Sequence, residues 1–172
     1  MPTFTQIGSA VTVGAGGAAN ITFSAIPNTY TDLIIKYSLR SNVSGVNESG
    51  GIRFNSDSGA NYTYKRLYGT GSAVGSDSPG SNFSWGGYVA GDTSTASTFG
   101  NGEMYIPNYA GSTNKSNSAD GVGENNATSA FMSLHANLWS NTSAITSIVL
   151  LPINGTSWNQ YSTAYLYGVS NA

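Results

Sequence analysis

The sequence predicts an all-β protein: a single antiparallel β-sandwich over residues 1–172, with nine or ten strands and long polar loops. Three observations predict this class. Apolar and polar residues alternate over many short stretches, which is the side-chain period of a strand. No window sustains the i, i+3, i+4, i+7 spacing of an amphipathic helix. Clusters of glycine, asparagine and serine separate the stretches, as turns do in sandwiches.

The clearest strand is predicted over residues 31–40, where one face is apolar and the other polar. The apolar face consists of Leu33, Ile35, Tyr37 and Leu39. The same reasoning predicts nine further strands, at residues 4–13, 19–24, 51–55, 62–68, 83–89, 102–106, 130–138, 144–153 and 161–169. Three polar stretches are predicted to be long loops gathered at one end or one side, at residues 69–81, 90–97 and 110–128.

Two strands carry specific expectations. In residues 130–138 the even-numbered residues Met132 and Leu134 are expected to face the core, which places His135 on the opposite face. The strand at residues 144–153 is apolar on both faces, so it needs cover on both. Either it is a central strand beneath a long loop, or its outer face meets a neighbouring subunit, as in trimeric sandwich modules. The candidate contact residues are Ile145, Ile148, Leu150, Tyr165 and Tyr167.

Composition excludes several function classes. Only 8% of residues are charged, against about a quarter in an average soluble protein. The six lysines and arginines are scattered, so we expect no nucleic-acid partner, and no apolar run is long enough to span a membrane. Cysteine is absent, His135 is the single histidine, and Glu103 is the one acid that does not lie in or beside a predicted loop or turn. We therefore expect no enzyme activity, no catalytic residue, no metal and no cofactor.

The segment at residues 55–61 places oxygen-bearing side chains at alternate positions around a glycine. It departs from the calcium loop of an EF-hand, because the glycine comes one place early and Arg66 stands where the bidentate glutamate belongs. We interpret it as a hairpin turn capped by Asn55, Asp57 and Asn61. Arg53 and Arg66 are expected to brace this turn through charge-assisted hydrogen bonds.

Aromatic residues near predicted turns offer a second kind of site. Trp85, Tyr88 and Tyr109 could form a platform on which sugar rings stack, because their rings are apolar on the face and polar at the edge. The same residue types are common in sandwich cores and at interfaces. Both interpretations are open at this stage.

Several segments resemble small virion structural proteins of tailed bacteriophages. The resemblance lies in Arg53 to Tyr62 with the following Arg66-Leu67-Tyr68-Gly69, in the opening from Phe4 to Tyr30, and in the ending that contains Leu138-Trp139 and Leu166-Tyr167-Gly168-Val169. It implies a jelly-roll-like sandwich in the virion, assembled in the host cytoplasm, which decorates the capsid or forms part of a tail appendage. It also implies other virion proteins as partners and a homotrimer. The rival expectation is a receptor-binding tail fibre module that binds a host-surface glycan.

Overall fold

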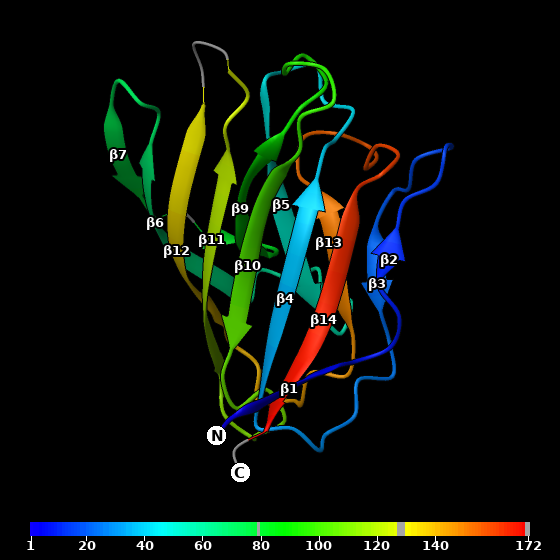
Figure 1. The fold of residues 1–172 in the computed structure, drawn as a ribbon. Helices are drawn as coiled ribbons and strands as arrows, with labels where there is room; N and C mark the ends of the chain where they lie inside the picture. Colours follow the sequence, from blue (N-terminus) through cyan, green and yellow to red (C-terminus); the bar gives the residue numbers. More distant parts are fainter. Residues whose placement is uncertain (79, 127–129, 171–172) are drawn as a thin grey trace.

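Two antiparallel β-sheets pack face to face in the computed structural model, which describes residues 1–78, 80–126 and 130–170 (Figure 1). All regular elements of the described residues are strands, so the all-β prediction is confirmed. The strands are β1 (Thr3–Gln6), β2 (Val11–Thr12), β3 (Ile21–Phe23), β4 (Asp32–Leu39), β5 (Asn47–Phe54), β6 (Tyr62–Gly69), β7 (Val74–Asp77), β8 (Gly80–Ser81), β9 (Ser84–Ala90), β10 (Gly100–Ile106), β11 (Lys115–Gly123), β12 (Phe131–Trp139), β13 (Ile148–Pro152) and β14 (Thr163–Ser170).

Strand order shows that the sandwich is built on a jelly roll. The large sheet runs β1-β14-β4-β10-β11-β12-β6-β7, and the small sheet runs β3-β13-β5-β9. Without β11, β12 and β6 to β8, the sheets reduce to β1-β14-β4-β10 opposite β3-β13-β5-β9. Along the chain these eight strands pass between the two sheets in the order that defines two interlocked Greek keys. We call this part the jelly-roll part.

The other strands widen one sheet only. β6, β7 and β8 lie between β5 and β9 in the sequence, and β11 and β12 lie between β10 and β13. These two insertions meet because β12 pairs with β6 from Met132↔Gly69 to Trp139↔Tyr62. We call β6, β7, β8, β11 and β12 the extension. The small sheet ends at β9, so β6 and β7 reach beyond its cover (Figure 1).

One hydrophobic cluster of the described residues fills the space between the sheets of the jelly-roll part and continues into the extension through Tyr62, Ala119 and Trp139. Its members include the four apolar residues predicted for residues 31–40, of which Leu33, Ile35 and Leu39 are fully buried. Trp158 closes one end of this cluster, and its indole Nε1 donates a hydrogen bond of 3.2 Å to the Leu150 carbonyl. The alternation rule therefore gave the correct inward face for β4.

The two layers touch through bare backbone where β9 crosses β11. Gly87 has a φ of +104°, and a Cβ placed on it would lie 2.7 Å from the Gly121 Cα. A Cβ on Gly121 would lie 2.8 Å from the Gly87 Cα. Both distances are shorter than real Cβ contacts, so each position requires glycine. Beside this contact the Tyr37 hydroxyl donates to the Gly86 carbonyl across the layers.

Two of the predicted long loops contain strands, which corrects the sequence-based prediction. Residues 69–81 contain β7 and β8, and residues 110–128 contain β11, apart from positions 79, 127 and 128, which lie outside the described residues. The apolar periodicity did not reveal β11, because its inward residues include Ala119, Gly121 and Gly123. These residues are small, and β9 packs close to them. The predicted strand at 4–13 also divides into β1 and β2 around Gly8, whose φ is +68°.

Candidate docking face on the strand extension

Strand β12 faces the opposite way from the sequence-based prediction. Ser133, His135 and Asn137 point into the sandwich and are buried, whereas Met132 and Leu134 point to solvent. The expected core face is therefore the outer face. This reversal places Met132 and Leu134 on the outer face and the polar side chains of β12 inside the sandwich.

Trp139 explains the reversal. Its side chain is fully buried, stacks on Tyr62 with ring centroids 6.3 Å apart, and lies 5.5 Å from the Phe54 ring centroid. Its Nε1 donates a 2.7 Å hydrogen bond to Asp57. Because side chains alternate along a strand, burying Trp139 turns every odd-numbered residue of β12 inward.

Inside the extension, Arg66 is the centre of an aromatic and ionic cluster. Its guanidinium lies 4.7 Å from the Trp85 ring centroid, 4.9 Å from that of Tyr68 and 5.4 Å from that of Tyr88. It forms a bidentate ion pair with Asp77 on β7, in which Nε donates to Oδ1 at 3.1 Å, and it also donates to the Tyr88 hydroxyl at 2.8 Å. Arg66 thus fixes β7 and β9 to β6.

His135 belongs to the same cluster. Its ring stacks on Trp85 at 5.9 Å between centroids, and Nε2 lies 2.9 Å from the Ser133 hydroxyl. The imidazole is 1% exposed, and burial together with the nearby Arg66 charge lowers its pKa to about 4. The His135 ring is therefore neutral and enclosed, and its role is to pack against its neighbours. Glu103 lies on the outer face and accepts a 2.6 Å hydrogen bond from Lys36.

The extension interior is incompletely satisfied. Among the described residues, four buried side-chain atoms have no hydrogen-bond partner, and all four lie on β9, β11 or β12. They are Ser84 Oγ, Trp85 Nε1, Asn117 Oδ1 and His135 Nδ1. An unpaired buried polar atom costs about 1–3 kcal/mol, so this region is less stable than an apolar core of equal size.

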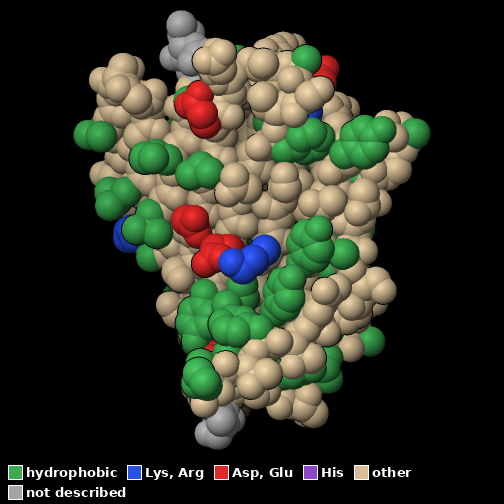
Figure 2. All heavy atoms as spheres, in the orientation of Figure 1, with side chains coloured by type: hydrophobic (Ala, Val, Ile, Leu, Met, Phe, Trp, Pro, Cys, Tyr) green, Lys and Arg blue, Asp and Glu red, His purple; other side chains and the backbone are tan. Residues whose placement is uncertain are grey.

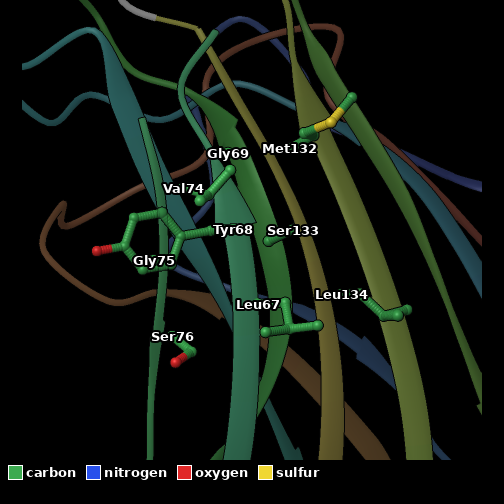
Figure 3. Close-up of a pocket in the computed structure, with 9 residues that line it drawn as sticks. All are labelled: Leu67, Tyr68, Gly69, Val74, Gly75, Ser76, Met132, Ser133 and Leu134. Atoms are coloured by element: carbon green, nitrogen blue, oxygen red, sulfur yellow. The ribbon is translucent and has the colours of Figure 1, made fainter. Parts of the chain in front are cut away.

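On the outer face, four large apolar side chains form a continuous surface that we call the outer patch. Leu67 and Met132 are each 62% exposed, Leu134 is 57% exposed and Val74 is 90% exposed. Leu134 pairs directly with Leu67, and Met132 with Gly69, which in turn pairs with Val74. Figure 3 shows Leu67 and Leu134 side by side, and a shallow groove runs over these residues. Exposed apolar surface of this kind marks interaction sites.

Charged side chains border the outer patch. On the β11 side, Asp120 lies beside Glu103, which is already paired with Lys36. Burial and repulsion from Glu103 raise the pKa of Asp120. On the β6 side stands exposed Lys65, one pleat from Leu67. Figure 2 shows apolar side chains over β7, β6 and β12 beside a central group of acidic and basic ones.

The predicted turn at residues 55–61 exists, but arginines do not brace it. Asp57 accepts hydrogen bonds from the Gly59 amide at 2.9 Å, the Asn61 side chain at 3.0 Å and Trp139, and these bonds lower the pKa of Asp57, with the Trp139 bond first in size. Asn55 holds residues 144–147, since its side chain accepts from the Thr146 and Ser147 amides and donates to the Ala144 carbonyl. Arg53 donates to the Asn82 carbonyl and Arg66 serves the extension cluster instead.

The three aromatic residues predicted to hold a glycan do not form a platform. Tyr109 is fully buried, and its hydroxyl donates to the Pro27 carbonyl. Tyr88 is buried against Phe131 and Arg66, and half-buried Trp85 is covered by Arg66 and His135. These rings are used for packing, so they offer no shared face on which a sugar could stack.

The predicted contact residues divide into two groups. Ile145, Ile148 and Leu150 are buried in the hydrophobic core beneath the large sheet, so their side chains present no surface to another chain. Tyr165 and Tyr167 lie half-buried on the outer face of β14, where a role in contact stays a prediction. The strand at residues 144–153 is thus a central strand, and it is shorter than predicted, as β13 between β3 and β5.

Two buried ionic side chains outside the extension are saturated by local partners. Glu48 accepts hydrogen bonds from the amides of Ser49 at 2.7 Å and Gly155 at 2.6 Å and from the Asn154 side chain at 2.9 Å. Arg40 donates to the carbonyls of residues 92, 94, 95 and 98, which fixes the predicted loop at 90–97. Both groups hold nearby main-chain segments in place, and their hydrogen bonds are made to the protein itself.

In the part of the chain that the structure describes, three or more His, Cys, Asp or Glu side chains nowhere gather as a metal site would require. The same residues include no helix with the length and apolar character needed to cross a membrane. No protein-family model matches the chain, and neither a curated protein sequence nor a solved structure matches it at a significant level.

Proposed function

We propose that this protein is a non-enzymatic structural component of a tailed-phage virion that adheres to neighbouring protein through the outer patch. It decorates the capsid or forms part of a tail appendage. The observation that carries the proposal is the reversed orientation of β12, which exposes Met132 and Leu134 while polar side chains occupy the interior. Burial of Trp139 holds this orientation in the monomer and leaves Met132 and Leu134 exposed, and an assembly would bury these two side chains.

The physical character of the outer patch suits permanent attachment. Leu67, Val74, Met132 and Leu134 would each contribute about 1.5–3 kcal/mol when fully buried against a partner. The chain carries too few charges for an electrostatic contact to dominate, with a formal net charge of −2. Adhesion should therefore depend weakly on salt, in contrast to attachment through ion pairs. Repeated copies on a symmetric particle would add avidity.

The residues that carry the resemblance to virion proteins support this role through structure. Asp57, Asn61 and Trp139 together fix the turn and the orientation of β12. They hold the framework that presents the outer patch, and none of them supplies a reactive group.

The test is to locate the protein on particles from cells that produce it. Antibodies against the recombinant protein should label the particles in immunogold electron microscopy, and the averaged density should place the sandwich on the shell or on a tail appendage. We expect Leu134→Asp to reduce incorporation at least tenfold. Thr22→Asp, on the exposed side of β3 in the small sheet, is the matched control and should leave incorporation unchanged.

Absence of the protein from purified particles that contain the other structural proteins would contradict the proposal. Equal incorporation of Leu134→Asp and the unchanged chain would contradict the outer patch as the adhesive surface. A glycan array on which the protein binds a defined sugar would favour the receptor-binding alternative, which the buried positions of Tyr88 and Tyr109 do not support.

A further inference from the structure

The outer face around β12 has the features of a surface that can pair with itself. Its centre is apolar, with Met132 and Leu134 on β12 and Leu67 on the neighbouring strand. A self-pairing face must also match charge with charge when it is rotated onto a copy of itself. The two charges that flank the apolar centre meet this condition, as their positions in the sheet show.

Lys65 and Asp120 lie on opposite sides of β12. Lys65 is on β6 and pairs with Ala136, whereas Asp120 is on β11 and pairs with Leu134. Both side chains are exposed on the outer face, and neither forms a salt bridge within 4.0 Å among the described residues. The other charges nearby are compensated, since Lys36 pairs with Glu103 and Arg66 with Asp77.

We propose that this face pairs with the same face of a second copy of the chain, about a two-fold axis that runs parallel to β12 between the two sheets. The inference rests on the proposed function and names the partner at the outer patch. Such an axis places β6 of one copy over β11 of the other. Leu134 then meets Leu134, while Lys65 of each copy faces the Asp120 side of its partner.

The spacing permits both ionic contacts. β6 and β11 each lie one strand, about 4.8 Å, from β12. Along the strand Lys65 and Asp120 differ by one pleat, about 7 Å, which the flexible lysine side chain can cover. A two-fold axis across the strands instead of along them would place Lys65 over the level of Gly69, where no acid stands.

The area also suits a second copy. Strands β10, β11, β12, β6 and β7 are arranged symmetrically about β12 in the sheet order. They contain 7, 9, 9, 8 and 4 residues, 37 in all, which at about 4.8 Å per strand and about 3.4 Å per residue present a flat area of roughly 600 Å², to which protruding side chains add. A standard interface needs about 800 Å² per partner. Face-to-face sheets about 10 Å apart form such interfaces in sandwiches.

The test measures mass and dissociation by analytical ultracentrifugation over a concentration series. The unchanged chain should reach twice the 17.8 kDa monomer mass. Leu134→Asp should be monomeric, and Lys65→Asp and Asp120→Lys should each raise the dimer Kd at least tenfold, because like charges then face each other twice. Circular dichroism checks that each variant retains its sheet. Asp92→Lys, an exposed reversal far from the face, is the control and should leave the Kd unchanged.

Mixing supplies the decisive result. Lys65→Asp combined with Asp120→Lys in equal amounts should form a heterodimer, because each of the two contacts then joins opposite charges. The double variant Lys65→Asp/Asp120→Lys should recover the homodimer for the same reason. A third variant, Leu67→Asp, should not be rescued by either partner.

Three outcomes would overturn the inference: a monomer at all concentrations, a mass of three chains, or charge variants that fail to recover on mixing. The proposed function and the dimer can be disproved independently. If the chain is monomeric while Leu134→Asp is still lost from particles, the outer patch binds another protein and the second copy is wrong. If the dimer forms as described but particles lack the protein, the virion role is wrong.

Discussion

The jelly-roll part and the extension share one sheet but are stabilised in different ways. In the jelly-roll part, apolar side chains such as Leu33, Ile35 and Leu150 fill the space between layers. In the extension, the inner side combines aromatic rings with Arg66, His135 and unpaired polar atoms, while Met132 and Leu134 point outward. The difference indicates that the jelly-roll part has the better-satisfied core, whereas the extension is less well satisfied inside and exposes apolar side chains on its outer face.

The largest expected effect is the loss of Trp139, where the two regions meet. Trp139→Ala removes a fully buried ring and the hydrogen bond to Asp57, so we expect the free energy of unfolding in urea to fall by about 3–5 kcal/mol. Trp85→Ala, on β9 where the ring packs against Arg66 and His135 of the extension, should cost less than half as much because Trp85 is only half-buried. Equal losses for both variants would show that the cluster around Arg66 is as tightly packed as the aromatic core around Trp139.

Next in size is a pH dependence that comes from His135. Its pKa is about 4 in the folded protein and about 6.5 when unfolded, so between these values the unfolded chain binds a proton that the folded chain does not. Stability should therefore fall by about 3 kcal/mol as the pH drops from 6.5 to 4, with a slope of at most about 1.4 kcal/mol per pH unit.

His135→Phe keeps a ring on Trp85 and should abolish this slope in urea unfolding curves recorded at several pH values. The contribution of Asp57 is separate, since its lowered pKa gives stability that is present above about pH 4 and is lost only below that pH. If His135→Phe retained the full slope between pH 6.5 and 4, the histidine would not be its source.

A smaller and more local effect is expected for Arg66→Met. The methionine can fill part of the volume but loses the pair with Asp77 and the contacts to three aromatic rings. We expect a loss of about 1–3 kcal/mol that is concentrated in the extension. Hydrogen exchange should accelerate at the β6 and β7 amides and stay unchanged in β13. Uniform acceleration through both sheets would mean that the two regions open together.

The smallest effect is expected at Val74, which is 90% exposed at the end of the large sheet. Val74→Ser should alter the free energy of unfolding of the monomer by less than about 0.5 kcal/mol. Dilute conditions that favour the monomer are the appropriate ones for this urea titration. A loss above about 1 kcal/mol would show that the outer patch already supports the monomer.

Alternation and turn chemistry were sufficient to predict the strands of the jelly-roll part, but not their order in the two sheets. The inward face of β4 and the turn capped by Asp57 and Asn61 follow from the local sequence, because each has a strong apolar or polar period. Ten strands were predicted from such patterns; the structure contains nine of them with shifted ends and divides the tenth, at residues 4–13, into β1 and β2. Where a strand faces an apolar core, its apolar residues recur at every second position, so the inward face can be recognised in the sequence.

The extension defeated the same reasoning for a physical reason. In β12 both faces carry apolar residues, and a preference for the even-numbered face ignored Trp139 at the strand end, which is the side chain that sets the orientation. The signal was available: one fully buried tryptophan outweighs several smaller residues. In β11, by contrast, the small inward residues gave no period to find, since only the approach of β9 explains them.

The contact between Gly87 and Gly121 has a consequence for the ancestry of this fold. A side chain at either position would meet the backbone of the other strand at less than 3 Å, so neither glycine can be replaced while the two strands keep this separation. In any lineage descended from this chain, the pair should therefore be inherited together or lost together. Sequences that lack both would have to hold the insertions at a greater separation from β9, and a docking geometry inherited from this protein would not transfer to them.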